Sequence, residues 1–349
     1  MNLVTGATGI VGMPLVVKLL QSGEAVRALR RATSDTSLVE AAVQRRVPEG
    51  RSRLEWVEGD LTDQASLEAA LEGVQRVFHC AALVSFHPKD HGQMDRINAQ
   101  GTAHLVDAML HCGTPRLLHV SSVAALGRKE GQPTNEDTLF EEQPGTTGYA
   151  RSKHRAEMEA WRGSVEGLPG GLVAVHPTVV LGPGDFSRSS GALFDRIARG
   201  LAWYPKGSNG FVGSEDVAEA CVRLGLSEVR DERFVLCAEQ WTYEALMKAI
   251  ALALHVRPPH RPVHRWMVGW IWRALALVEA LTGRRSVATR ESLANTGARH
   301  TYEGTRIVEA MEGLGISWSY TPIREVIEQT AKAYLRGRSE GREGTRSSD

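Results

Sequence analysis

Short apolar runs alternate with amphipathic stretches along the first two thirds of the chain. The apolar runs predict strands at 3–4, 25–29, 54–57, 74–82, 116–120, 172–180 and 234–237. Between them, apolar residues at helical spacing predict helices at 10–22, 38–44, 98–110, 145–162 and 214–226, with another beginning near Gln64. Strands and helices that alternate in this way form a parallel sheet, so we predict an α/β fold with a doubly wound sheet.

The pattern becomes mainly helical after residue 240. Helical spacing predicts helices at 243–254, 266–281, 303–314 and 322–335. Residues 337–349 contain no apolar side chain and are expected to form a disordered tail. We therefore predict a larger sheet domain formed by residues 1–177 plus 213–239. The smaller, mainly helical lobe that binds the substrate is predicted to comprise residues 178–212 plus 240–336.

The most apolar stretch outside the predicted sheet is 266–281. It is shorter than the ~20 apolar residues that a membrane-spanning helix needs, and it contains Arg273 and Glu279. Three interpretations remain: a buried helix of the smaller lobe, a lid over an apolar pocket, or a helix lying in a membrane surface. We expect no stable membrane insertion.

Charge and cysteine content narrow the classes of partner. The 349 residues include 41 basic and 41 acidic side chains, so no net charge favours nucleic acid or an anionic membrane. The four cysteines lie in apolar surroundings without C-x-x-C spacing, which is typical of a reducing compartment. Pro88 separates His87 from His91, so we expect no metal site there. The glycine-rich stretch begins too close to Met1 to leave room for a secretory signal. We expect a cytoplasmic protein with a small-molecule partner, compatible with a homodimer.

The stretch LVTGATGIVG, residues 3–12, joins the first predicted strand to the first predicted helix. A strand, a glycine turn and a helix start point backbone N–H groups and a positive helix end at one place, which suits a pyrophosphate. The G-x-x-G-x-x-G spacing also occurs in ordinary loops, and that interpretation stays open. The candidate cofactor contacts in the turn are Gly6, Thr8, Gly9, Ile10 and Gly12.

Arg30 and Arg31 end the second predicted strand, where a nucleotide fold meets the adenosine ribose. An acidic residue at this position bonds the ribose 2′-hydroxyl, whereas arginine accommodates a 2′-phosphate, so we favour NADP and keep NAD open. Two solvated arginines are the alternative. Asp60, with Leu61, follows the third strand and is predicted to contact adenine, while Asp63 is the better cap for the next helix.

Three further groups stand at the ends of predicted elements. Ala81 and Ala82 close the fourth strand and are small enough to let a cofactor pass. A serine pair follows the fifth strand, and Tyr149 and Lys153 lie four residues apart, on one face of a predicted helix. Such a pair is common on helices, so its significance depends on the rest of the pattern.

Taken together, TGATGIVG, GDL at 59–61, VSSVAALG at 120–127, YARSK at 149–153 and HPTVVLGPGD at 176–185 are far more specific than any one of them. With these motifs the chain resembles, over about residues 1–335, the extended short-chain dehydrogenase/reductase family, of the NAD-dependent epimerase/dehydratase type. The resemblance implies a doubly wound Rossmann domain followed by a substrate lobe.

The resemblance also implies roles for individual residues. Tyr149 would be the acid/base, and Lys153 would bind the nicotinamide ribose and lower the pKa of Tyr149 by its charge. Ser122 would bind the substrate oxygen, with the neighbouring Ser121 ranked second and placed among the cofactor contacts. Pro177 matches the family proline near the nicotinamide. Hydride transfer to a ketone leaves an alkoxide, so a proton donor beside a cation is consistent with this chemistry.

Within the family, nucleotide-sugar enzymes usually carry Phe-Asn after the sixth strand, whereas this chain has His176-Pro177-Thr178. That departure resembles the dihydroflavonol-reductase and 3β-hydroxysteroid-dehydrogenase branch. We therefore expect an oxidoreductase that interconverts a ketone and a secondary alcohol on a fairly apolar small molecule. One alternative is a nucleotide-sugar epimerase or dehydratase with tightly bound NAD. The other is a non-catalytic protein that binds a dinucleotide.

Overall fold

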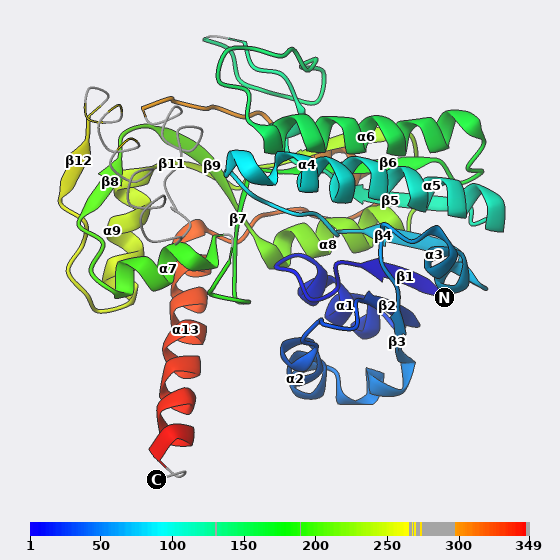
Figure 1. Ribbon diagram of the computed structural model, residues 1–349, viewed down its shortest axis with the longest axis horizontal. Coiled ribbons are helices and arrows are strands. Elements are labelled where there is room, and N and C mark those ends of the chain that lie inside the picture. The colour runs from blue at the N-terminus through cyan, green and yellow to red at the C-terminus, as the bar shows by residue number, and fades with distance from the viewer. Residues whose placement is uncertain are drawn as a thin grey trace. The chain divides into compact units, whose positions relative to one another are not determined.

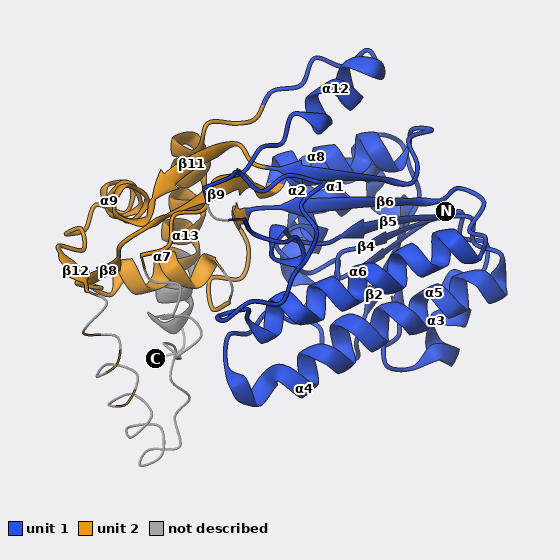
Figure 2. Ribbon diagram, turned by 90° about the horizontal axis from the view of Figure 1, so that it is seen from above, with its two compact units in different colours: residues 1–178, 215–236, 302–319 blue, residues 179–214, 237–301, 320–349 orange. Residues whose placement is uncertain are grey.

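The computed structural model describes residues 1–129, 131–188, 190–264 and 297–346, together with 267, 269 and 273. The chain forms two compact units (Figure 2). The first unit comprises residues 1–178, 215–236 and 302–319; the second comprises 179–214, 237–301 and 320–349. Every residue predicted to hold a cofactor or to act in catalysis belongs to the first unit.

A seven-stranded parallel sheet forms the centre of the first unit (Figure 1). Its strand order is β10-β6-β5-β4-β1-β2-β3. The strands are β1 (Asn2–Thr5), β2 (Val26–Arg30), β3 (Leu54–Glu58), β4 (Arg76–His79), β5 (Arg116–Val120), β6 (Leu172–Pro177) and β10 (Glu232–Leu236). The chain crosses from one half of the sheet to the other between β3 and β4, so the sheet is doubly wound as predicted.

Helices cover both faces of this sheet (Figure 2). Helices α3 (Gln64–Leu71), α5 (Gly101–Cys112) and α6 (Gly148–Glu166) lie side by side on one face. Helices α1 (Gly12–Gln21), α2 (Ser37–Arg46) and α8 (Ser214–Gly225) lie on the other. A short helix, α4 (His91–Met94), and a π-helical turn precede α5, so helical structure begins earlier than predicted.

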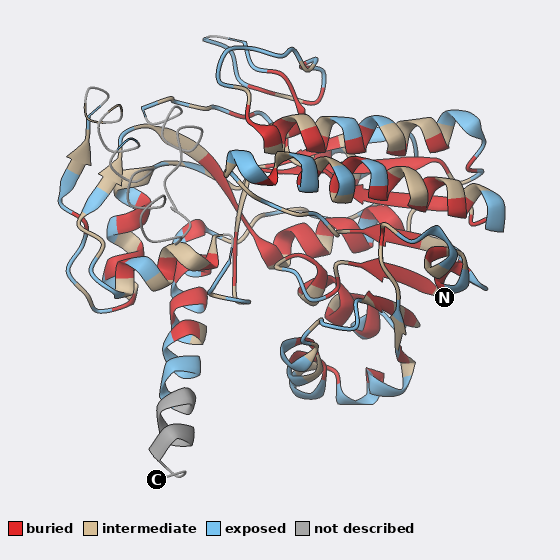
Figure 3. Cartoon of the chain, viewed as in Figure 1, coloured by how far each residue is buried: buried red, intermediate tan, exposed pale blue. Residues whose placement is uncertain are grey.

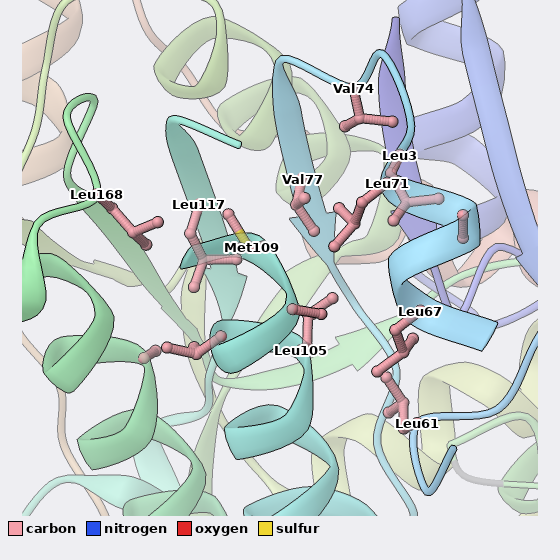
Figure 4. Packing of buried hydrophobic residues seen from close by; sticks show 14 of the residues in the cluster. Leu3, Leu61, Leu67, Leu71, Val74, Val77, Leu105, Met109, Leu117 and Leu168 are labelled. Carbon is pink, nitrogen blue, oxygen red and sulfur yellow. The ribbon is translucent and has the colours of Figure 1, made fainter. Parts of the chain in front are cut away.

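Strands β1, β5 and β6 are buried from end to end, and β4 is buried from Val77 to His79 (Figure 3). Their side chains meet those of α3 and α5 in one core cluster, in which Leu3, Val77, Leu105, Met109 and Leu117 are fully buried (Figure 4). Strands covered on both faces need continuous apolar runs, which explains why these runs were readable in the sequence.

Residues 302–319 belong to the first unit, although helical patterning placed them in the smaller lobe. Helix α12 (Arg306–Gly313) follows Gly304, which lies against the backbone of β10. A Cβ at Gly304 would lie 2.5 Å from the carbonyl oxygen of Val235, so glycine allows this close approach. Arg306 also forms an ion pair with Asp137 at 2.9 Å.

The second unit contains strands that the sequence pattern did not predict. Its two small sheets have the orders β11-β9-β7 and β12-β8. The strands are β7 (Val179–Leu181), β8 (Trp203–Pro205), β9 (Ser208–Gly213), β11 (Glu239–Thr242) and β12 (Arg261–Val263). The predicted strand 172–180 is divided at Thr178, so that β6 joins the large sheet and β7 joins a small one.

Helices α7 (Gly191–Ala198), α9 (Tyr243–Ala253) and α13 (Ile323–Arg346) complete the described part of the second unit, around a core that includes Phe194, Phe211 and Ile250. Helix α13 extends through Arg346, where composition predicts a disordered tail from 337; extending a formed helix adds one hydrogen bond per residue. The apolar stretch 266–281 lies outside the described residues, apart from 267, 269 and 273. Among the described residues, no helix is both long and apolar enough to cross a membrane.

Candidate active site

The carboxyl ends of parallel strands meet at one edge of a sheet, and the predicted site residues stand at that edge. Gly6 follows β1, Arg30 ends β2, Asp60 follows β3, Ala81 follows β4 and Pro177 ends β6. Ser121 and Ser122 follow β5, and the nearby start of α6 carries Tyr149 and Lys153. The topology therefore gathers residues that are far apart in the sequence.

The glycine turn, residues 6–12, has no room for side chains at two of its glycines. Gly6 has φ +67°, and a Cβ there would lie 2.6 Å from the amide nitrogen of Ala81. A Cβ at Gly12 would lie only 2.1 Å from the carbonyl oxygen of Gly6. Gly9 donates its N–H to the same oxygen at 2.9 Å, which closes the turn. Because both positions lack side chains, the turn after β1 can approach the segment after β4 at Gly6, and the start of α1 can approach the turn at Gly12.

The surface of the turn is open. Thr8 and Gly9 are exposed and Ile10 is half-buried. Helix α1 begins at Gly12 without a side-chain cap at its N-terminus. A helix start with N–H groups lacking a side-chain cap and a Cβ-free approach fits the pyrophosphate of a dinucleotide.

The second and third strands bring two arginines and a carboxylate to the same edge. Arg30 is half-buried and pairs in register with Glu58 of β3, while Arg31 is exposed. Burial raises the pKa of Asp60, but hydrogen bonds from Thr62 and the charges of Arg31 and Arg96 outweigh it, so the pKa is lowered. Asp60 is thus an ionised acceptor, held by the N–H and the hydroxyl of Thr62, each at 2.8 Å.

Two neighbours of Asp60 have structural roles. Asp63 caps α3 by accepting from the N–H of Ser66, as predicted. Leu61 is buried, and its Cβ would lie 2.8 Å from a Cβ at Gly101. The Leu61 side chain therefore packs inward at the start of α5.

Strand β4 ends at His79, three residues before the predicted end of that strand. Thr5 accounts for this ending, because its hydroxyl oxygen is 2.7 Å from Nδ1 of His79 and accepts the N–H of Ala81 at 3.3 Å. Ala81 is half-buried against the glycine turn and Ala82 is exposed.

Ser122, Tyr149 and Lys153 converge where β5 ends and α6 begins. Ser122 caps a 3₁₀ turn by accepting the N–H of Ala124 at 3.2 Å, and its hydroxyl lies close enough to Tyr149 to act on the pKa of that phenol. Thr147 caps α6 by accepting from the N–H of Ala150 at 3.1 Å, which fixes the start of the helix one residue before Tyr149. The structure therefore places the two predicted catalytic hydroxyls together.

Lys153 is one turn further along α6 and is 2% exposed. Its ammonium group donates a hydrogen bond to the carbonyl oxygen of Val120 at 2.9 Å. Burial lowers the pKa of Lys153 to about 8, against the opposing charge of Glu157. A buried ammonium held near the strand end is chemically suited to a polar ligand at this edge.

The predicted effect of Lys153 on Tyr149 is not what the structure gives. The Lys153 charge was expected to lower the pKa of Tyr149, yet burial raises it, and the hydrogen bond with Ser122 only partly opposes burial. In this structure the phenol is therefore in its protonated, proton-donating form at neutral pH.

Sequence reasoning missed a buried network behind these residues. The Ser121 hydroxyl donates to Glu157 at 2.6 Å, so it points into the protein rather than toward a ligand. Glu157 follows Lys153 by one helical turn, and we call Tyr149, Lys153 and Glu157 the Tyr149 face of α6. The spacing of the three residues was visible in the sequence, but the partners of Glu157 were not.

The family comparison agrees with this arrangement. The model of the NAD-dependent epimerase/dehydratase family matches residues 2–237, which include the whole candidate site. The chain belongs to this family. The predicted family and the predicted doubly wound fold are confirmed.

Two similar proteins carry the names of different enzymes. Sterol demethylase protein B of Methylococcus capsulatus is 33% identical over 261 residues, 74% of this chain and 76% of that protein. A putative dihydroflavonol 4-reductase of Synechocystis is 30% identical over 271 residues, 76% of this chain and 75% of that protein.

Solved structures reproduce the fold over nearly the whole chain. The crystal structure of gox2253 has a TM-score of 0.77 at 27% identity and covers 97% of this chain and 98% of its own. A dTDP-glucose 4,6-dehydratase of Bacillus anthracis, solved in complex with NAD, has a TM-score of 0.72 at 15% identity, with 96% and 97% covered. At such identity the second likeness shows the fold alone.

Proposed function

We propose that this family member is an NADP-dependent oxidoreductase that interconverts a ketone and a secondary alcohol on a fairly apolar small molecule. The observation that carries the proposal is that Ser122 and Tyr149 lie together where β5 ends and α6 begins, one helical turn before the buried Lys153. Together these groups supply a hydrogen-bond donor, a proton donor and a fixed positive charge at one edge of the sheet.

The residues at this edge fit a nicotinamide dinucleotide. The turn glycines, Gly6, Gly9 and Gly12, would hold the pyrophosphate. Asp60 and Leu61 would contact the adenine. The cofactor would pass the small residues Ala81 and Ala82, and its nicotinamide would lie near Pro177. Thr8, Ile10 and Ser121 would contribute through their backbone. When bound, the cofactor supplies or accepts the hydride.

Proton transfer falls to the chain's own residues. In the reductive direction, the Tyr149 hydroxyl gives its proton to the substrate oxygen as negative charge develops there, and Ser122 donates a hydrogen bond to the same oxygen. The protonated phenol fits this direction, because its raised pKa keeps the proton in place until it is needed. Lys153 would bind the nicotinamide ribose, as the resemblance implies, from the end of β5 where its ammonium is held.

Two exposed apolar residues support an apolar substrate. Val84 and Phe86 lie on the segment that follows β4, with 43% and 44% of their surfaces exposed. The Phe86 ring meets the Tyr149 ring edge-on, with 6.0 Å between centroids. An exposed ring next to the proton donor favours an aryl or alicyclic ketone over a charged sugar nucleotide.

A nucleotide-sugar epimerase or dehydratase with tightly bound NAD is the second candidate, because the family carries that name and its fold is shared by such enzymes. The test incubates the protein with NADPH and a panel of aryl and alicyclic ketones, and separately with UDP-hexoses. We expect stoichiometric NADPH oxidation with a ketone and no interconversion of the sugars. Protein that purifies with NAD and equilibrates two nucleotide sugars without a change in nicotinamide absorbance would support the second candidate instead.

A further inference from the structure

Glu157 is a buried carboxylate at the centre of four polar contacts. It is 2% exposed, and its Oε2 accepts the Ser121 hydroxyl at 2.6 Å and lies 2.7 Å from Nε2 of His176. Its Oε1 forms an ion pair with Nε of Arg233 at 3.1 Å and accepts from the indole N–H of Trp161 at 3.3 Å. These partners come from β6, β10, α6 and the end of β5, so one carboxylate joins four elements.

Burying a charged residue of this kind opposes the free energy of folding. A buried ion pair costs several kcal/mol of desolvation per ion, and apolar residues of similar volume often replace it without loss of stability. Glu157 nevertheless stands on the Tyr149 face of α6, one turn beyond Lys153 and two turns beyond Tyr149. It also holds Ser121, the residue before Ser122. Glu157 is therefore bonded to the segment that carries Ser122 and stands on the helix face that carries Tyr149 and Lys153.

We propose that Glu157 is a positioning residue for the reaction. Through Ser121 it fixes the segment that carries Ser122, and its negative charge keeps the Lys153 ammonium charged. The proposal rests on the proposed function. His176 and Arg233 hold the carboxylate in place from the neighbouring strands. His176 belongs to the run His176-Pro177-Thr178 that departs from the nucleotide-sugar pattern, and in this chain it contacts Glu157.

The charges around Lys153 give the expected direction. His79 and Cys80 at the end of β4 and His119 on β5 face the ammonium, and burial lowers the pKa of both histidines, which leaves them neutral. Glu157 in turn interacts electrostatically with three further groups: His176, Arg233 and His154.

Burial raises the pKa of Glu157, but His176, Ser121 and Arg233 lower it to about 2 overall, so the carboxylate is ionised whenever Lys153 titrates. Glu157 thus opposes the loss of the Lys153 proton.

The test measures NADPH affinity by fluorescence titration between pH 6 and 10. Loss of the Lys153 charge is expected to weaken binding, so the pH at which affinity falls reports the state of Lys153. Glu157→Gln should move that fall to lower pH, with affinity reduced about tenfold near pH 8. Arg233→Met, which removes a competing cation, should move the fall to higher pH. Glu159→Gln on the same helix, which breaks only the pair with Arg162, should match the wild type.

Wild-type pH dependence in both Glu157→Gln and Arg233→Met would overturn the proposal. If Glu157→Gln does not fold, as judged by circular dichroism, Arg233→Met still decides, and a downward shift in that variant contradicts the charge effect. Ser121→Ala separates the second role, because it should lower kcat severalfold without moving the binding profile. NADPH binding can be measured without a ketone. If no ketone is reduced but both variants still shift the pH at which NADPH affinity falls, the proposed substrate is rejected and the role of Glu157 toward Lys153 is retained.

Discussion

The glycine turn and the Tyr149 face of α6 contribute to one proposed site by opposite means. Gly6 lies so close to the backbone of Ala81, and Gly12 so close to the carbonyl oxygen of Gly6, that a single Cβ would overlap backbone atoms at either position. On α6, Lys153 and Glu157 are large, ionisable and almost fully buried. The turn thus works by leaving side chains out, and the helix works by burying charged ones with specific partners.

This difference determines how each region should fail. Added volume should disrupt the turn, because backbone atoms have nowhere to move. Loss of a single polar atom should disrupt the Tyr149 face, because each buried group there depends on a partner. The variants below test this contrast, starting with the largest expected effect.

Tyr149→Phe removes one oxygen atom from the Tyr149 face and should reduce kcat by roughly 10²–10⁴-fold, the usual contribution of a positioned acid or base. NADPH affinity should stay close to the wild-type value, because the ring and the fold remain. Steady-state kinetics and fluorescence titration measure the two quantities. Turnover near the wild-type rate would reject Tyr149 as the proton donor.

Glu157→Gln should destabilise the protein in a pH-dependent way. The folded-state pKa of Glu157 is lowered from 4.5 to about 2, so its charge contributes stability above pH 4.5 that is lost as pH falls toward 2. At ~1.4 kcal/mol per pH unit, the variant should lose about 3 kcal/mol at pH 7. Urea unfolding at pH 7 and below pH 4 should show the gap from wild type closing in acid; a constant gap would contradict this assignment.

The same contrast explains what the sequence could predict. The glycine turn and the alternation of strands and helices follow from local spacing, since glycines at fixed intervals and a continuous apolar run each need only neighbouring residues to be recognised. Tyr149 and Lys153 were also readable, because they share one helix face. The partners of Glu157 were not, because Ser121, His176 and Arg233 come from different strands and meet only in the folded sheet.

Other predictions failed for the same physical reason. The raised pKa of Tyr149 depends on burial by distant segments, which spacing does not reveal. The short strands β8, β9, β11 and β12 pair within small sheets and lack the long apolar runs of the central sheet. Residues 302–319 join the first unit through a backbone approach at Gly304, although their helical pattern gave no sign of it.

Gly12→Ala tests the turn by adding one methyl group. The new Cβ would lie 2.1 Å from the Gly6 carbonyl oxygen, so the backbone must shift, at a cost of about 1–3 kcal/mol for overpacking. We expect lower stability and weaker NADPH binding together. Gly92→Ala is the matched control, because a Cβ there meets no atom within 4 Å. Unchanged NADPH affinity in Gly12→Ala would show that the turn does not need this close approach.

The smallest expected effect concerns two arginines at the carboxyl end of β2: Arg30, which ends the strand, and Arg31, which follows it. If these arginines contact a 2′-phosphate, NADPH should bind more tightly than NADH, and Arg30→Asp should reverse the order, because a carboxylate repels the phosphate and can accept from a ribose hydroxyl. A change of about tenfold, or ~1.4 kcal/mol, is expected for one charge contact of a half-buried arginine. Glu58 pairs in register with Arg30 across the two strands. Arg31→Asp measures the contribution of the second arginine separately. Arg45→Asp, an exposed position at the end of α2, makes the same charge change away from the turn and should leave the preference unaltered. Fluorescence titration of both cofactors decides the matter: equal affinities in the wild type would mean that neither arginine contacts a 2′-phosphate. Cofactor choice would then depend on Asp60, an ionised acceptor that Thr62 holds at this edge.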